Sequence, residues 1–163
     1  MKFTSQIMFA VTINLFFTSC GGGGNDNTLA KLVRIWNGSV TLTSNGCPRD
    51  IPAEFQTLTF NHQVSENLDS PGQATITLTD ENIPCKDIGA DQNSDHFAAV
   101  CPDGALPGFL PDLDCQEQRV WEYKLVSPDS DFVDVVRTAY VHCSKDGVLQ
   151  LACPVVYEGG ASA

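Results

Sequence analysis

Residues 34–44 read RIWNGSVTLTS, and apolar and polar side chains alternate along this stretch. One face carries Trp36, Gly38, Val40 and Leu42. The opposite face carries Asn37, Ser39, Thr41 and Thr43. A period of two residues is typical of a β-strand with one buried and one solvated face. Antiparallel sheets commonly have one dry face and one wet face, so the stretch predicts an antiparallel sheet.

The same alternation recurs along most of the chain, and no stretch shows a helical period. Leu58, Phe60, His62 and Val64 share a face within residues 56–65, and residues 74–79 read ATITLT. Further strands are expected at residues 96–101, 119–127, 133–143 and 148–157. About seven to eight strands predict an all-β fold, either a small antiparallel β-barrel or a β-sandwich. Two long loops are also expected, one over residues 80–95 and one over the Pro- and Gly-rich residues 102–118.

The first 19 residues have the features of a secretory signal peptide. Lys2 provides a positive charge, and residues 7–17 form an apolar stretch that is too short to span a membrane as a helix. The stretch ends in Phe17-Thr18-Ser19-Cys20, which resembles the bacterial lipobox, although Phe stands where that motif usually has Leu. The resemblance implies that Cys20 carries a diacylglyceryl group and becomes an acylated (for example palmitoylated) N-terminus. An ordinary secretory peptide, which would leave Cys20 as a free thiol, is the alternative.

These features predict three segments. We expect a lipoprotein signal peptide over residues 1–19, a lipidated Cys20 with a linker over residues 20–28, and a single β domain over residues 29–163. Gly21 to Gly24 would make the linker flexible. The lipobox resemblance places the protein in the bacterial cell envelope, and Gly rather than Asp after Cys20 favours the outer membrane.

The cysteine count agrees with a lipid on Cys20. The chain has seven cysteines, so six remain for disulfides, which form in oxidising compartments. These six are Cys47, Cys85, Cys101, Cys115, Cys143 and Cys153. None of them forms the close C-x-x-C pair typical of zinc sites, so disulfides are favoured over a metal.

The connectivity of the disulfides stays open at this level. A tight turn around residues 145–147 would hold Cys143 and Cys153 on the order of 13 Å apart along the strands. A disulfide needs Cα atoms within about 7 Å. Either the turn is a longer loop or these two cysteines do not pair, and a Cys143–Cys153 disulfide is slightly favoured.

Charge excludes some partners. Beyond Ser19 the chain has 8 basic and 20 acidic residues, a net charge of −12 with His neutral. Such a charge repels polyanions, so no nucleic acid partner is expected. Direct attraction to anionic lipid headgroups is disfavoured for the same reason.

Few residues suggest chemistry. His62, His96 and His142 stand alone, and His62, on the apolar face of its strand, is expected to be a hydrogen-bonded core residue. Asp91, Asn93 and Asp95 resemble the opening of a calcium loop, but the Gly and Glu that complete such a loop are missing. Solvated acidic loops are the favoured interpretation and a weak Ca²⁺ site is the alternative. No catalytic or phosphate-binding motif occurs, so neither enzymatic activity nor a cofactor is expected.

Two functional hypotheses remain in addition to the membrane anchor, the first favoured over the second, and an enzyme is a third and less favoured hypothesis. The first is a module that binds another protein or serves a structural role. The second is a barrel that binds a small apolar ligand in a pocket of roughly 300–1,000 Å³, lined by residues such as Phe60, Trp121 or Tyr123. Trp36-Asn37-Gly38 followed by a meander of strands is faintly similar to lipocalin-type barrels, which carry Gly-x-Trp instead.

Overall fold

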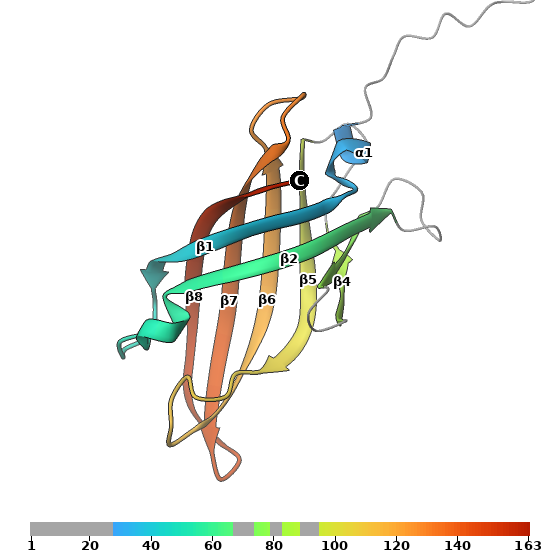
Figure 1. The fold of residues 1–163 in the computed structure, drawn as a ribbon. Coiled ribbons are helices and arrows are strands. Elements are labelled where there is room, and N and C mark those ends of the chain that lie inside the picture. The colour runs from blue at the N-terminus through green and yellow to red at the C-terminus, as the bar shows by residue number, and fades with distance from the viewer. Residues whose placement is uncertain (1–27, 67–73, 79–82, 89–94) are drawn as a thin grey trace, which may run out of the picture.

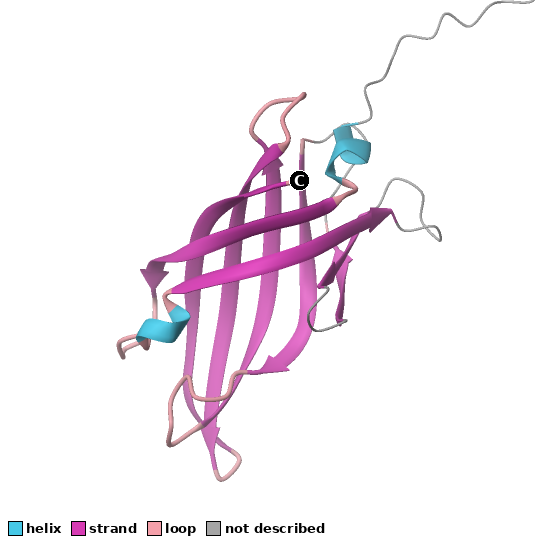
Figure 2. Ribbon diagram, in the orientation of Figure 1, coloured by secondary structure: helices cyan, strands magenta, loops and turns pink. Residues whose placement is uncertain are grey.

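The computed structural model describes residues 28–66, 74–78, 83–88 and 95–163. Eight antiparallel strands follow one another in sequence order and form a closed barrel (Figure 1). The strands are β1 (Ile35–Asn45), β2 (Thr57–Glu66), β3 (Ala74–Leu78), β4 (Ile83–Asp87), β5 (His96–Ala105), β6 (Asp114–Leu125), β7 (Phe132–Lys145) and β8 (Val148–Ser162). Two short helices, α1 (Thr28–Leu32) and η1 (Ala53–Phe55), lie at opposite ends of the barrel (Figure 2). The all-β prediction is confirmed, and of its two forms the barrel is the one observed.

Pairing between the first and last strands closes the barrel. β1 and β8 pair from Asn37 opposite Ser162 to Asn45 opposite Val155. The two backbones come very close at Gly159, where a Cβ atom would lie 2.0 Å from the Ser39 carbonyl oxygen. Glycine is therefore required at this point of the seam.

The predicted alternation determines what fills the barrel. Trp36 and Val40 of β1 are fully buried, whereas Asn37, Ser39 and Thr41 are exposed. The longest strands repeat the pattern, and on β6 every second residue from Cys115 to Leu125 is buried. Interior positions of a small barrel are filled by side chains in this way.

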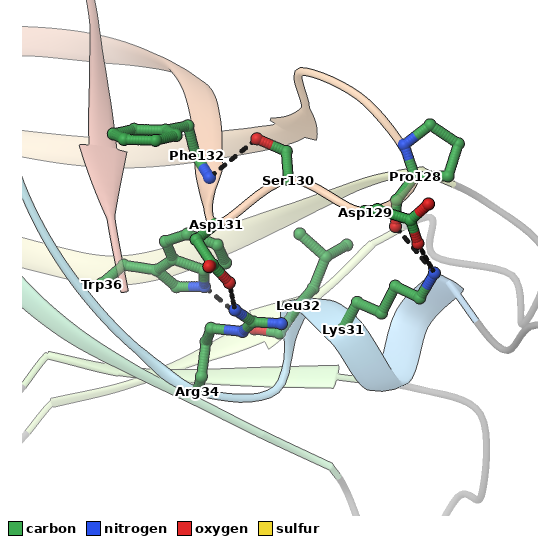
Figure 3. A network of polar contacts seen from close by, with 9 residues as sticks. All are labelled: Lys31, Leu32, Arg34, Trp36, Pro128, Asp129, Ser130, Asp131 and Phe132. Atoms are coloured by element: carbon green, nitrogen blue, oxygen red, sulfur yellow. Dashed lines mark hydrogen bonds and ion pairs between the residues drawn. The ribbon is translucent and has the colours of Figure 1, made fainter.

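The helix α1 covers one end of the barrel. Leu32 is fully buried, and its carbonyl oxygen accepts a hydrogen bond from Trp36 Nε1 at 3.0 Å. Arg34 lies over the Trp36 ring and forms an ion pair of 2.7 Å with Asp131 (Figure 3). Lys31 pairs with Asp129 at 3.1 Å. These contacts fix the start of the barrel to the connection between β6 and β7.

Three disulfides join the six predicted cysteines, as Cys47–Cys153, Cys85–Cys101 and Cys115–Cys143. The slight preference for a Cys143–Cys153 pair is wrong, because β7 and β8 form a tight hairpin. Lys145 lies opposite Val148, and the two turn residues between them have positive φ. Cys143 therefore lies opposite Leu151, and Cys153 lies opposite Val141. Cys143 is bonded instead to Cys115 of β6, and Cys153 is bonded to Cys47 in the connection between β1 and β2.

The two long loops of the sequence prediction are shorter in the structure. β5 extends to Ala105 and β6 begins at Asp114, so the second loop covers only residues 106–113. Pro102 does not end β5, because the pairing with β6 is interrupted between Cys101 and Gly104 and resumes afterwards, as in a β-bulge. Within residues 80–95, β4 occupies Ile83–Asp87.

Candidate functional site

A cavity of about 210 Å³ lies in the barrel on the side of η1 and the loop 106–113, both of which contribute to its lining. Inward-facing residues of β2, β6, β7 and β8 line it, together with Thr59 and Asn61 from the outer face of β2. Phe55 of η1 and Phe109 of the loop 106–113 cover it, and their rings meet edge to face with centroids 5.6 Å apart. Phe109 is almost completely buried although it belongs to a loop. The exposed Thr59 also lines the cavity, so the site is a chamber that is partly open to solvent.

Disulfides fasten the segments that cover the chamber. Cys47, in the connection that contains η1, is bonded to Cys153 of β8. Cys115, the second residue of β6 after the loop 106–113, is bonded to Cys143 of β7. The backbone nitrogen of Leu106 also donates to the Cys115 carbonyl oxygen at 2.9 Å, which closes the base of that loop. Both covering segments are thus held near the mouth of the barrel.

Three buried charged side chains line the chamber. Arg137 Nη2 lies 2.6 Å from each carboxylate oxygen of Glu117. Arg119 Nε lies 3.8 Å from the same carboxylate. The Arg137 guanidinium also lies over the rings of Trp121 and Tyr157, at 5.7 and 4.9 Å from their centroids. Arg137 is therefore held in one position by a carboxylate and two aromatic faces.

The strand register explains why these groups meet. Glu117, Arg119 and Trp121 alternate along β6 and so point to the same side of the sheet. Arg137 of β7 lies directly opposite Trp121 of β6 on one side and opposite Tyr157 of β8 on the other. Residues that are far apart in sequence are thus neighbours on the inner wall.

His62 forms the deeper part of the wall. It is 4% exposed, and its Nδ1 forms a hydrogen bond with the hydroxyl of Tyr123. Burial, together with the smaller effect of the positive charges of Arg119 and Arg137, lowers the pKa of His62 to about 3. His62 is therefore neutral at physiological pH, and the prediction of a hydrogen-bonded core histidine is confirmed.

Two tyrosines in this region stay protonated. Burial raises the pKa of Tyr123 well above its usual value. Burial also raises the pKa of Tyr157, against the opposing effect of Arg137. Neither hydroxyl carries a charge near neutral pH, so the fixed charges of the chamber are those of Glu117, Arg119 and Arg137.

One buried donor on the chamber wall has no acceptor. Trp121 is 4% exposed, and its Nε1 makes no hydrogen bond to any described residue. Buried polar groups nearly always have a partner, so such a donor calls for an explanation. A group that enters the chamber could accept this hydrogen bond.

The sequence-predicted site residues divide into those inside and those outside the described residues. Cys20, Asp91 and Asn93 lie outside them. Asp95 is exposed, and its carbonyl oxygen accepts a hydrogen bond from the Leu125 nitrogen. Within residues 28–66, 74–78, 83–88 and 95–163, no group of three or more His, Cys, Asp or Glu side chains is arranged to hold a metal.

The remaining predicted residues are distributed around the barrel. His96 lies 3.5 Å from Glu122, and His142 lies 3.3 Å from Gln116. Both are partly exposed and do not line the chamber. Phe60 and Trp121 do line it, whereas Tyr123 does not. The chamber is also smaller than the roughly 300 Å³ at which sites for drug-sized ligands begin.

Sequence reasoning missed the charged residues Glu117, Arg119 and Arg137. A signal was present, because Glu117 and Arg119 share the face of β6 that also carries Trp121 and Tyr123. Charged residues at inward positions of an alternating strand are unusual, since such residues are rarely buried without a partner. That pattern alone could have indicated a polar interior.

Comparison with known proteins adds no relative, because no family model, no curated protein and no solved structure matches the chain. In the part of the chain that the structure describes, no helix is long and apolar enough to cross a membrane. The fold and the site together define a class, a disulfide-linked antiparallel barrel with a small charged chamber inside.

Proposed function

We propose that the protein is a lipid-anchored binding protein of the bacterial cell envelope, and that its barrel binds a small molecule in the chamber. The observation that carries this proposal is the cavity of about 210 Å³, lined by both aromatic rings and buried charged groups. Aromatic walls with a few converging polar groups are the usual composition of ligand sites.

Stability alone gives a weak reason for buried charges. Replacing a buried ion pair by well-packed apolar residues is often neutral or stabilising. The neighbouring interior is built in the apolar way, with Phe97 stacked on Tyr123 and with Val133 and Val135 fully buried. Among the described residues, the buried charges gather where the cavity lies, which supports a role in binding.

The proposed location rests on two kinds of observation. The lipobox resemblance at Cys20 implies an anchor outside the cytoplasm. The three disulfides agree with this, because disulfides persist in secreted and envelope proteins and are rare in the cytosol.

Ring-sized probes can test the proposal. A cavity of about 150 Å³ is enough to bind benzene in another protein, so the chamber can hold one aromatic ring. We expect benzoate or benzyl alcohol to change the fluorescence of Trp121 and to raise Tm, since a ligand of the native state stabilises it. Trp36 does not line the cavity but lies opposite His62 on the neighbouring strand, so the Trp36→Phe variant isolates the signal of Trp121.

The control is Val141→Phe, which fills the chamber from β7. This variant should lose both responses while keeping the circular dichroism of the folded barrel. If neither the charged nor the neutral probe changes fluorescence or Tm in the wild type, the chamber is no ligand site and the proposal fails.

A second candidate is a module that binds another protein. It is favoured by Val148 and Leu149, two apolar side chains that are 61% exposed at the start of β8, next to the tight β7–β8 turn. Photo-crosslinking from position 149 in intact cells should then capture one defined chain, whereas crosslinking from the exposed Glu158 should not. Equal or absent crosslinking at both positions would contradict this candidate.

A further inference from the structure

We infer that the end of the barrel that carries α1 rests on the surface of the lipid bilayer, with the apolar side chains of Val126 and Phe132 inserted among the lipids. This inference rests on the proposed lipid anchor and adds the surface with which the anchored domain meets the membrane. It is carried by the exposure of these two side chains, by the pairing of the charges between them, and by the short distance from Cys20 to α1.

Two large apolar side chains are exposed at this end. Val126 is 58% exposed and Phe132 is 61% exposed. They flank the connection between β6 and β7, and the Val126 nitrogen donates to the Phe132 carbonyl oxygen at 3.2 Å. Phe132 points to the outer face of β7, since Val133 beside it is buried. The connection projects from the barrel beside α1, so both side chains lie at the base of this projection (Figure 1).

The acidic residues of this connection are neutralised. Residues 126–131 contain two carboxylates, and both are paired with cations at the α1 end (Figure 3). Asp129 lies 3.1 Å from Lys31, and Asp131 lies 2.7 Å from Arg34. The connection is therefore balanced in charge inside a strongly acidic chain. This balance reduces the repulsion that exposed carboxylates meet at a membrane surface, and it suits zwitterionic headgroups.

The covalent link to the anchor keeps this end close to the membrane. Eight peptide bonds lead from Cys20 to Thr28, where α1 begins. Even a fully extended chain of this length spans at most roughly 28 Å. The turn between β7 and β8 lies much farther away, because the 14 residues of β7 span roughly 45 Å at the usual rise of a strand. The anchor therefore holds the α1 end next to the bilayer in every orientation of the barrel.

The tether also explains why a small apolar surface is sufficient. Contact of a tethered domain with its membrane is an intramolecular event at a high effective concentration. Two apolar side chains are too few to recruit a free domain, but they can orient one that is already anchored. Apolar side chains at the boundary between headgroups and acyl chains are the usual means by which a protein surface lies on a bilayer.

Electron paramagnetic resonance of a spin label tests the inference on the full lipidated chain in phosphatidylcholine vesicles. The label is attached at position 127 (Ser127→Cys), beside Val126, and in a control at position 150 (Gln150→Cys) near the opposite end. Both positions are exposed. Oxygen concentrates in the bilayer and a nickel chelate stays in water, so the ratio of their effects on the label reports contact with lipid. We expect this ratio to be severalfold higher at position 127 than at position 150.

Substitutions identify the side chains that insert. Val126→Asp places a charge at the lipid contact, so the ratio at position 127 should fall to the value at position 150. Val148→Asp adds the same charge to a similarly exposed valine at the opposite end and should leave the ratio at position 127 unchanged. If the added thiol disturbs the disulfides, Ser127→Trp and Gln150→Trp replace the labels. Dibrominated phosphatidylcholine should then quench the Trp at position 127 more strongly.

The outcomes separate this inference from the proposed anchor. Flotation of the vesicles shows independently whether the chain is anchored. A chain that floats but has the same water-like ratio at both positions overturns the inference and leaves the anchor in place. A label at position 127 that is shielded from both oxygen and nickel also overturns it, because a protein then covers this end. A chain that does not float overturns the anchor and, with it, this inference.

Discussion

Replacing His62 with Gln should make the stability of the barrel less sensitive to mild acid. The pKa of His62 is lowered from 6.5 to about 3 in the folded protein. At pH values between these two pKa values, His62 binds a proton in the unfolded chain but not in the folded chain. The free energy of unfolding therefore falls as the pH falls through this window, and the contribution of neutral His62 is fully present only above pH 6.5.

The size of the effect follows from the two pKa values. At about pH 5 the linkage costs the wild type about 2 kcal/mol relative to about pH 7.5. Gln does not titrate, and its amide can still form a hydrogen bond with Tyr123. The variant should be less stable than the wild type near neutral pH, and this difference should shrink by about 2 kcal/mol at about pH 5.

Urea denaturation followed by circular dichroism, with the disulfides intact, measures the two free energies at each pH. His142→Gln, on the outer side of β7, serves as the matched control and sets the baseline. A difference between wild type and His62→Gln that stays constant within a few tenths of a kcal/mol across this window would refute the buried neutral histidine.

Three further predictions concern the chamber, the seam and the disulfides. Glu117→Gln leaves two buried guanidinium groups without their carboxylate and should cost about 3–5 kcal/mol in urea denaturation, and a loss below about 1 kcal/mol would contradict the buried ion pair. Gly159→Ala places a Cβ against the β1 backbone and should lower the free energy of unfolding by about 3 kcal/mol. In the control Gly160→Ala the nearest contact of the Cβ would be 3.2 Å, so the loss should be clearly smaller. Equal melting temperatures of the two variants would argue against the closed seam. The double substitution Cys47→Ala and Cys153→Ala opens a link across a sequence separation of 106 and should cost about 4–5 kcal/mol by the chain-entropy argument, while an unchanged denaturation midpoint would show that this disulfide does not form.

The strands could be predicted from the sequence because burial on a sheet follows a period of two residues. Trp36 and Val40 were identified as inward-facing for this reason, and so was His62. The choice of a barrel could not be made, since it depends on the pairing of β1 with β8 across nearly the whole chain. The disulfide pairing depends on register in the same way, because Cys115 meets Cys143 only when β6 and β7 are aligned.

The candidate site was predictable only in part. Phe60 and Trp121 were expected to face the interior, and they line the chamber. The ion pair of Glu117 and Arg137 joins two strands and residues 20 positions apart. The alternation within a single strand does not indicate which residues of the next strand it meets. The loop 106–113 turns Phe109 inward as a cover, and no local pattern in its Pro- and Gly-containing sequence indicates this.

The most direct test of a ligand site inside the barrel is an NMR experiment that locates a bound probe. Intermolecular nuclear Overhauser effects are measured between the ring protons of benzoate and the assigned side chains of the protein. A ligand in the chamber should give contacts to Phe60 and Trp121, and none to the exposed Phe132 at the start of β7. Contacts to exposed residues alone, with none to Phe60 or Trp121, would contradict a ligand site inside the barrel.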